Sequence, residues 1–191
     1  MGICAAFLDG GYIEKVIQHD HDRASIDYGK LALAMAEGEH LLRAYYYNCL
    51  PFQSDPPTQE ERDRYSGKHR FYEALEHLPR FEVKLGRLTH LGYSSEGRPI
   101  LQQKRVDIML ATDMINLAIK GRVSSISLFT GDSDLIPAIE HIKSEGIRIT
   151  LWHGDISGEN TAPSRELYKI ADERIRLTGE MVAHMRRDTA A

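Results

Sequence analysis

Short apolar runs alternate along the chain with segments in which apolar residues recur at helical spacing. The apolar runs predict five strands, at residues 3–8, 40–48, 81–85, 126–129 and 147–152. The segments between them predict helices at residues 12–18, 28–37, 58–77, 104–121 and 135–145. Strands that alternate with helices favour a mainly parallel sheet with right-handed crossovers. We therefore expect an α/β fold.

The remaining segments have weaker patterns. Residues 88–102 carry two glycines and one proline, and they predict an irregular hairpin or loop over the active face. Residues 164–171 and 172–178 predict a final helical region, whereas residues 181–191 show no strong pattern. Thr58 begins the longest helix, with Glu61 placed to complete a capping box. We expect one domain over residues 1–178, followed by a C-terminal tail at 179–191.

Composition narrows the class of protein. A chain of 191 residues with 42% hydrophobic composition is long enough for one well-buried core. The first apolar run has about six residues, far fewer than the roughly 20 that cross a bilayer. Two cysteines without a signal peptide favour a reducing cytoplasm, so we expect a cytoplasmic protein with no membrane partner. Acidic residues outnumber basic ones by 28 to 24, so a polyanion would need a local basic patch.

Three separated aspartate motifs fall where the predicted strands end. Asp9 follows the first apolar run, Asp132 and Asp134 follow the fourth, and Asp107 opens the segment that begins at Lys104. Ligands of open α/β sheets bind outside the carboxyl ends of the strands, where residues distant in sequence converge. Carboxylates gathered there would repel one another unless a cation neutralised them, and oxygen ligands suit Mg²⁺ or Mn²⁺. The pattern predicts a divalent metal site that acts on phosphate.

Each aspartate also has a structural interpretation. Asp9 before two glycines is a common turn residue, Asp134 is a helix cap, and Asp107 in a first helical turn is favoured by the helix dipole. Asp113 is rotated away from Asp107 on an ideal helix, which predicts a capping role or a contact with a water molecule beside the metal ligands. Ser133, which lacks the surroundings of a serine nucleophile, is likewise assigned outside the ligand set.

Basic residues and missing motifs complete the candidate chemistry. Lys84, Arg87 and Lys104 flank the predicted sheet edge, so we expect them to bind phosphate. The nine histidines lack zinc-binding spacing, and neither a Walker A motif nor a dinucleotide-binding glycine pattern is present. Serine hydrolases, P-loop enzymes and dinucleotide enzymes are therefore disfavoured.

Four segments in this order carry a family resemblance: residues 7–11 (FLDGG), 104–113 (KRVDIMLATD), 130–135 (TGDSDL) and 164–172 (SRELYKIAD). Together they resemble the NYN domain family, in the LabA-like branch of PIN-like nucleases, over residues 3–177. The resemblance implies a PIN-like, three-layer, Rossmann-like fold with a mainly parallel sheet of about five strands. Asp9, Asp107, Asp132 and Asp134 match the acidic positions of the family, whereas Tyr12 stands where the family usually has asparagine.

The resemblance also implies a function. It indicates a ribonuclease that uses Mg²⁺ or Mn²⁺ to hydrolyse phosphodiester bonds of single-stranded or structured RNA, leaving a 5′-phosphate. One alternative is a catalytically silent RNA-binding or scaffold module of the same fold. A second is a haloacid-dehalogenase-like phosphatase, although that class needs an aspartate at the position of Gly11. The sequence leaves a homo-oligomer open.

Overall fold

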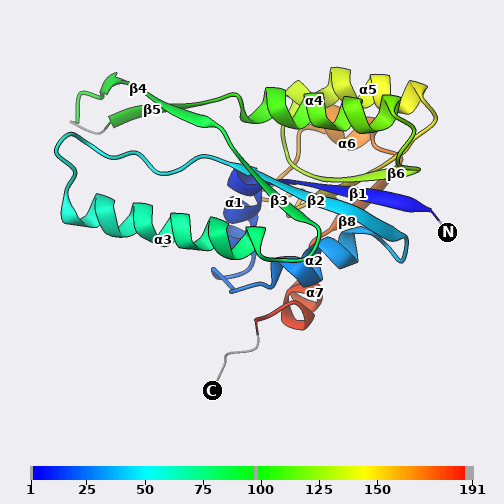
Figure 1. Cartoon of the computed structure of the whole chain (residues 1–191), viewed down its shortest axis with the longest axis horizontal. Coiled ribbons are helices and arrows are strands. Elements are labelled where there is room, and N and C mark those ends of the chain that lie inside the picture. Colours follow the sequence, from blue (N-terminus) through cyan, green and yellow to red (C-terminus); the bar gives the residue numbers. More distant parts are fainter. Residues whose placement is uncertain (1, 97–98, 188–191) are drawn as a thin grey trace.

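The computed structural model describes residues 2–96 and 99–187. A parallel six-stranded sheet in the order β3-β2-β1-β6-β7-β8 forms the centre of the molecule, flanked by helices (Figure 1). Its strands are β1 (Ile3–Asp9), β2 (His40–Asn48), β3 (Phe81–Leu85), β6 (Ser125–Phe129), β7 (Arg148–His153) and β8 (Glu173–Arg176). The predicted α/β class is confirmed, and five of these strands lie where apolar runs predicted them.

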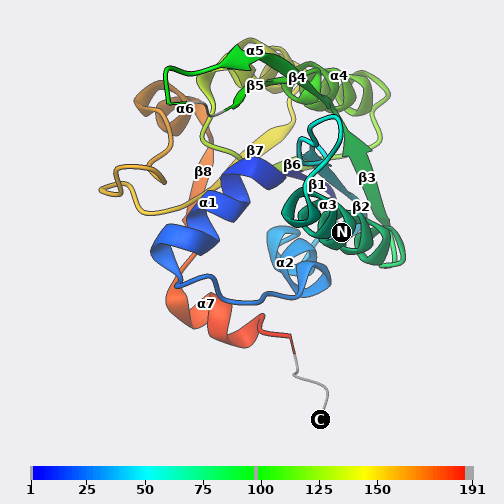
Figure 2. The same cartoon turned by 90° about the vertical axis from the view of Figure 1, so that its left-hand side faces the viewer.

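Helices cover both faces of the sheet. The helices are α1 (Gly10–Asp20), α2 (Tyr28–Met35), α3 (Gln59–Glu76), α4 (Val106–Ile119), α5 (Ile136–Ser144), α6 (Arg165–Ile170) and α7 (Gly179–His184). Alternate residues of β1 point to opposite faces, so Leu8 packs in the core with α1, α2, α3 and α7, whereas Phe7 packs in the core with α4, α5 and α6. Figures 1 and 2 show these three layers. Because β1 is buried on both faces, its sequence is almost continuously apolar.

The strand order reverses between β1 and β6. From β1 the chain moves outward through β2 to β3, and from β6 it moves outward in the opposite direction through β7 to β8. Leu8 at the end of β1 lies opposite Phe129 at the end of β6. The crevice outside these two strand ends is the topological switch point, where open α/β sheets bind ligands.

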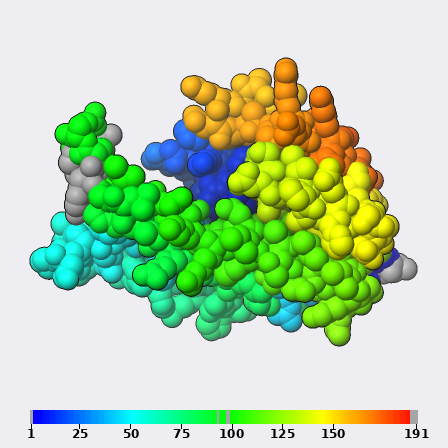
Figure 3. Space-filling view, turned by 90° about the horizontal axis from the view of Figure 1, so that it is seen from above, coloured from blue at the N-terminus to red at the C-terminus, as the bar shows by residue number. Residues whose placement is uncertain are grey.

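Two elements connect β3 to α4 at this edge. Strands β4 (Arg87–Tyr93) and β5 (Pro99–Lys104) form an antiparallel hairpin with an irregularity between His90 and Gly92. The hairpin extends beyond the end of the sheet in Figure 1 and stands clear of the body in Figure 3. The sequence prediction of an irregular hairpin in this segment is confirmed.

The C-terminal region differs from its prediction. Residues 173–176 form β8, not the predicted helix, because α6 ends at Ile170 and Ala171 takes an extended conformation with ψ 142°. Asp172 then accepts a hydrogen bond from Ile149 N (2.9 Å), which holds the chain beside β7. Residues 181–191 showed no strong pattern, yet residues 181–184 belong to α7, which Thr178 caps and which buries Val182. Residues 188–191 lie outside the described residues. The division into a domain and a tail stays a prediction.

Among the described residues, no helix is both long and apolar enough to cross a membrane.

Candidate active site

Asp9 lies at the end of β1 and caps α1. Its Oδ1 atom accepts a hydrogen bond from Tyr12 N (3.1 Å), and its Oδ2 atom accepts one from the buried Thr130 hydroxyl (3.1 Å). Burial raises the pKa of Asp9 above its usual value, although both hydrogen bonds oppose this shift, and the nearby charge of Asp107 raises it further. The carboxylate is thus held in one orientation in surroundings that disfavour its charge.

Asp132 and Asp134 lie just after β6, where Asp132 caps the turn η1 (Ser133–Leu135) and Asp134 lies within it. The Asp132 carboxylate accepts a hydrogen bond from Asp134 N (2.9 Å), and the Asp132 backbone N–H donates to the Thr130 hydroxyl (3.3 Å). Thr130 therefore contacts both Asp9 and the backbone of Asp132, which fixes the spacing of the two strand ends.

Asp107 belongs to the first turn of α4, as the sequence predicted. The pKa of Asp107 is raised by partial burial and then by the negative charges of Asp132 and Asp134. Asp107 is thus a carboxylate beside the negative charges of the two aspartates that follow β6.

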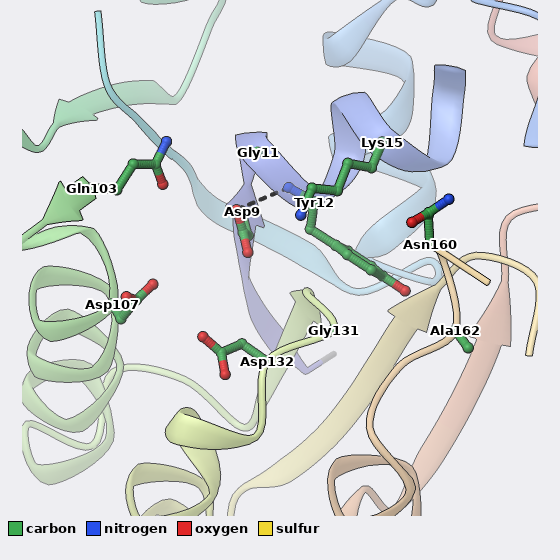
Figure 4. A pocket seen from close by; sticks show the side chains of 10 residues that line it. All are labelled: Asp9, Gly11, Tyr12, Lys15, Gln103, Asp107, Gly131, Asp132, Asn160 and Ala162. Atoms are coloured by element: carbon green, nitrogen blue, oxygen red, sulfur yellow. Dashed lines mark hydrogen bonds between the residues drawn. The ribbon is translucent and has the colours of Figure 1, made fainter. Parts of the chain in front are cut away.

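Asp9, Asp107 and Asp132 border a cavity of about 480 Å³ at the switch point, which we call the carboxylate cavity. Its lining residues are Asp9, Gly11, Tyr12, Lys15, Gln103, Asp107, Gly131, Asp132, Asn160 and Ala162. Figure 4 shows the carboxylates of Asp9, Asp107 and Asp132 turned toward one common space, and Figure 3 shows the recess from outside. Asp134 is exposed and lines an adjoining cavity with Asp107. The four predicted ligands thus divide into three in one cavity and one beside it.

The carboxylates fit a divalent cation by their chemistry, not by a preformed geometry. Within the described ranges, no three His, Cys, Asp or Glu side chains lie close enough together to form a metal-binding group. The oxygen-only donor set is nevertheless of the kind that Mg²⁺ or Mn²⁺ prefers. A cation would also stabilise the charged forms of Asp9 and Asp107, which burial and neighbouring carboxylates disfavour. A bound cation would draw these side chains together.

Asp113 and Lys84 lie apart from both cavities. The Asp113 carboxylate accepts hydrogen bonds from Tyr47 Oη and from Lys84 Nζ, each at 2.7 Å. Lys84 also pairs with Glu82 at 3.4 Å and lies over the ring of Tyr45. The charge of Lys84 is thus matched by two carboxylates outside both cavities, and its predicted role in phosphate binding stays a prediction. Asp113 is the partner in this ion pair, and its predicted support of the metal ligands stays a prediction too.

The other predicted residues lie nearer the site. Lys104 lines the adjoining cavity, and Arg87 is exposed directly opposite Lys104 at the base of the hairpin. Ser133, between Asp132 and Asp134, lines neither cavity.

Sequence reasoning missed four side chains that line the carboxylate cavity: Tyr12, Lys15, Gln103 and Asn160. Tyr12 was noted as a departure from the family, yet nothing in the sequence shows which group it contacts. Lys15 is exposed on α1, one turn beyond Tyr12, and its helical position was the available signal. Gln103 and Asn160 reach the cavity from the hairpin and from a loop, where no periodicity predicts orientation.

Tyr12 joins the start of α1 to the loop that follows β7. Its hydroxyl donates to Thr161 O (2.5 Å) and accepts from Gly154 N (3.2 Å), and burial raises the pKa of Tyr12 to about 12. The Tyr12 ring packs directly against the backbone of Gly131. A residue with a side chain would not fit there, because its Cβ atom would lie 2.5 Å from the ring. Tyr12 thus holds the loop that carries Asn160 against the cavity.

Comparison with known proteins places this fold. The NYN domain family model matches residues 4–178. A protein of unknown function, VPA0982 from Vibrio parahaemolyticus, has a crystal structure that is similar over 93% of both chains, with a TM-score of 0.65 and 18% identity. That identity shows a shared fold alone. MurG from Acinetobacter baumannii covers 94% of this chain and 46% of its own at 10% identity, and its TM-score of 0.41 is too low to support an argument.

No curated protein matches the chain. The family match spans all four predicted aspartates and both strand ends of the switch point. Since it covers most of the sequence, the chain belongs to the NYN domain family.

Proposed function

We propose that this protein is a metal-dependent ribonuclease that hydrolyses RNA phosphodiester bonds at the carboxylate cavity. NYN domains are generally nucleases, and the PIN-like nucleases typically use divalent metals. The observation that carries the proposal is the convergence of Asp9, Asp107 and Asp132, from three elements, on one cavity at the switch point. The LabA-like branch and the choice of RNA rest on the sequence resemblance.

The carboxylates would hold Mg²⁺ or Mn²⁺, with Asp134 completing the ligand set from the adjoining cavity. When bound, the cation supplies a more acidic water and neutralises phosphate charge. The Asp9 carboxylate is oriented by hydrogen bonds from Thr130 and from the first turn of α1. Its side chain therefore already has one fixed conformation before a cation binds. In Figure 4, Asp107 and Asp132 point toward the same space from two other directions.

The remaining side chains of the cavity suit the phosphate and the sugar. Lys15 is exposed at the rim and can attract a phosphate oxygen as a point charge. Asn160 and Gln103 offer amide donors and acceptors from opposite walls. We infer that these three groups position the chain of the nucleic acid while the aspartates act on the scissile bond.

The test is incubation of the purified protein with labelled single-stranded and structured RNA in Mg²⁺, Mn²⁺ or EDTA. We expect cleavage with metal, none in EDTA, and none by Asp132→Asn. Asp63→Asn is the control, because Asp63 is an exposed acid on α3 that lines neither cavity. Intact RNA in every arm would contradict the proposal.

A catalytically silent RNA-binding module is the second candidate. It is favoured by the absence of a preformed metal-binding group among the described side chains. Tight RNA binding without cleavage in either metal would support it. A trapped phosphoenzyme would instead support the phosphatase alternative. The sequence argues against that alternative, because glycine stands at position 11, where the phosphatase class needs its second aspartate.

A cytoplasmic location also stays a proposal. Cys4 and Cys49 are buried free thiols, which is compatible with a reducing compartment.

A further inference from the structure

A second cavity of about 530 Å³ adjoins the carboxylate cavity. Its lining residues are Gln103, Lys104, Arg105, Asp107, Ile108, Ala111, Asp134 and Leu135. Gln103 and Asp107 belong to both cavities. A polymer with one phosphate at the carboxylates would therefore place its next unit in the second cavity.

The second cavity has an apolar side. Ile108 is 72% exposed, although it lies one residue after Asp107 and beside the cavity. Ala111 follows one turn later on α4, and the buried Leu135 lies on the facing turn. A flat apolar ring can cover Ile108, and every nucleic acid base has such a face.

The other side of the second cavity carries two cations that have no partner among the described residues. Within residues 2–96 and 99–187, the side chains of Lys104 and Arg105 form no hydrogen bond or ion pair. Arg87 lies directly across the hairpin from Lys104, and like charges in that position destabilise a strand pair. Asp107 and Asp134 are the acids of this cavity, and the proposed function assigns both to the cation. The remaining charge is positive, as a phosphate site requires.

The backbone of Arg105 is also strained. Its φ angle of 78° lies in the left-handed region, which disfavours every residue with a side chain except, to a lesser degree, asparagine and aspartate. Such strain persists only where the surrounding structure imposes it, and active sites are among the places where it gathers. Glycine would fit this backbone better, so arginine at this position costs stability.

We propose that the second cavity binds an unpaired nucleotide next to the scissile phosphate, with its base on Ile108 and its phosphate held by Lys104 and Arg105. The inference rests on the proposed function and adds that the substrate is single-stranded at this position. A base inside a duplex has both faces covered by neighbouring bases, so it cannot also lie on Ile108.

Binding without cleavage tests this inference separately from catalysis. The full chain with Asp132→Asn, in Mg²⁺, would be titrated with a labelled RNA of about twelve nucleotides and with its duplex. Adding Ile108→Ser should weaken single-strand affinity about three- to tenfold and leave duplex affinity unchanged. Adding Arg105→Gly should weaken single-strand affinity and reduce the salt slope by about 0.7, without lowering the melting temperature.

Two substitutions are matched controls. Ile119→Ser removes an isoleucine that is 61% exposed at the other end of α4, and Arg23→Gly replaces another arginine with positive φ (56°) that lines neither cavity. Both should bind like the parent. The inference is overturned if Ile108→Ser and Arg105→Gly also bind like the parent, if duplex binds as well as single strand, or if the parent binds neither. Selective single-strand binding by a protein that never cleaves RNA would contradict the proposed function alone.

Discussion

At the residue scale, Asp107 and Asp132 repel each other whenever no cation is present. Asparagine at position 132 keeps an oxygen that can accept the hydrogen bond from Asp134 N, but it removes one negative charge. We therefore expect Asp132→Asn to leave the metal-free melting temperature unchanged or to raise it by up to about 2–4 °C, the shift that about 1 kcal/mol gives in a domain of this size. Differential scanning calorimetry in EDTA measures this change.

The matched variant is Asp132→Ala, which removes the charge and the hydrogen-bond acceptor together. The free energy of unfolding of Asp132→Ala should be about 1 kcal/mol lower than that of Asp132→Asn, because the cap of η1 is lost. If Asp132→Asn itself melts far below the parent without metal, Asp132 is a structural residue and the repulsion is unimportant.

The same repulsion predicts a pH dependence. The folded-state pKa of Asp107 is raised, so the folded protein binds more protons than the unfolded protein between the usual carboxyl pKa and the raised value. The stability of the metal-free protein should therefore fall as pH rises through that window. The stability advantage of Asp132→Asn should be largest at neutral pH and disappear near pH 3.8, the usual value. Urea unfolding at several pH values checks this, and an advantage that grows toward acid would contradict it.

At the element scale, Tyr12 is the contact between α1 and the loop after β7. Tyr12→Phe removes the hydrogen bonds to Thr161 O and Gly154 N while keeping the ring against Gly131. We expect a loss of about 1–3 kcal/mol in unfolding free energy, faster amide exchange at residues 154–162, and slower RNA cleavage.

Tyr65→Phe is the control for this prediction, because the Tyr65 side chain lies on α3 away from both cavities. It should match the parent in stability and amide exchange. Unchanged exchange in Tyr12→Phe would show that other contacts, such as the one between Asp20 and Thr161 (2.9 Å), hold the loop alone.

Elements differ in how far the sequence predicts them. Strand β1 is almost continuously apolar and β6 keeps three apolar residues beside two serines, so the positions of these strands and of the aspartates that follow can be predicted. Strand β8 has the sequence Glu-Arg-Ile-Arg and lies at the sheet edge, where the contact with β7 and not a local preference makes it extended. Asn160 could not be predicted because its loop is placed by Tyr12 and Asp20, which are distant in sequence.

At the scale of the whole molecule, the net charge of −4 means that nucleic acid must be attracted by a local strip of cations. Lys104 is exposed beside the site, so Lys104→Ala should weaken RNA binding. It should also reduce the slope of log affinity against log salt concentration by about 0.7. Affinity measured against salt concentration in the Asp132→Asn background shows both effects.

Lys84→Ala is the informative comparison. Lys84 is paired with Asp113, so its removal should leave the salt slope of RNA binding unchanged and lower stability instead, by leaving a half-buried carboxylate without its cation. Equal salt slopes for Lys104→Ala and the parent would remove Lys104 from the strip.

Anomalous diffraction from crystals soaked in Mn²⁺ tests most directly whether Asp9, Asp107 and Asp132 together hold a divalent cation. We predict one or two manganese peaks within the carboxylate cavity, in contact with oxygen atoms from at least two of these three aspartates. Manganese bound only elsewhere on the molecule, or carboxylates that stay apart with no peak between them at saturating Mn²⁺, would contradict this prediction.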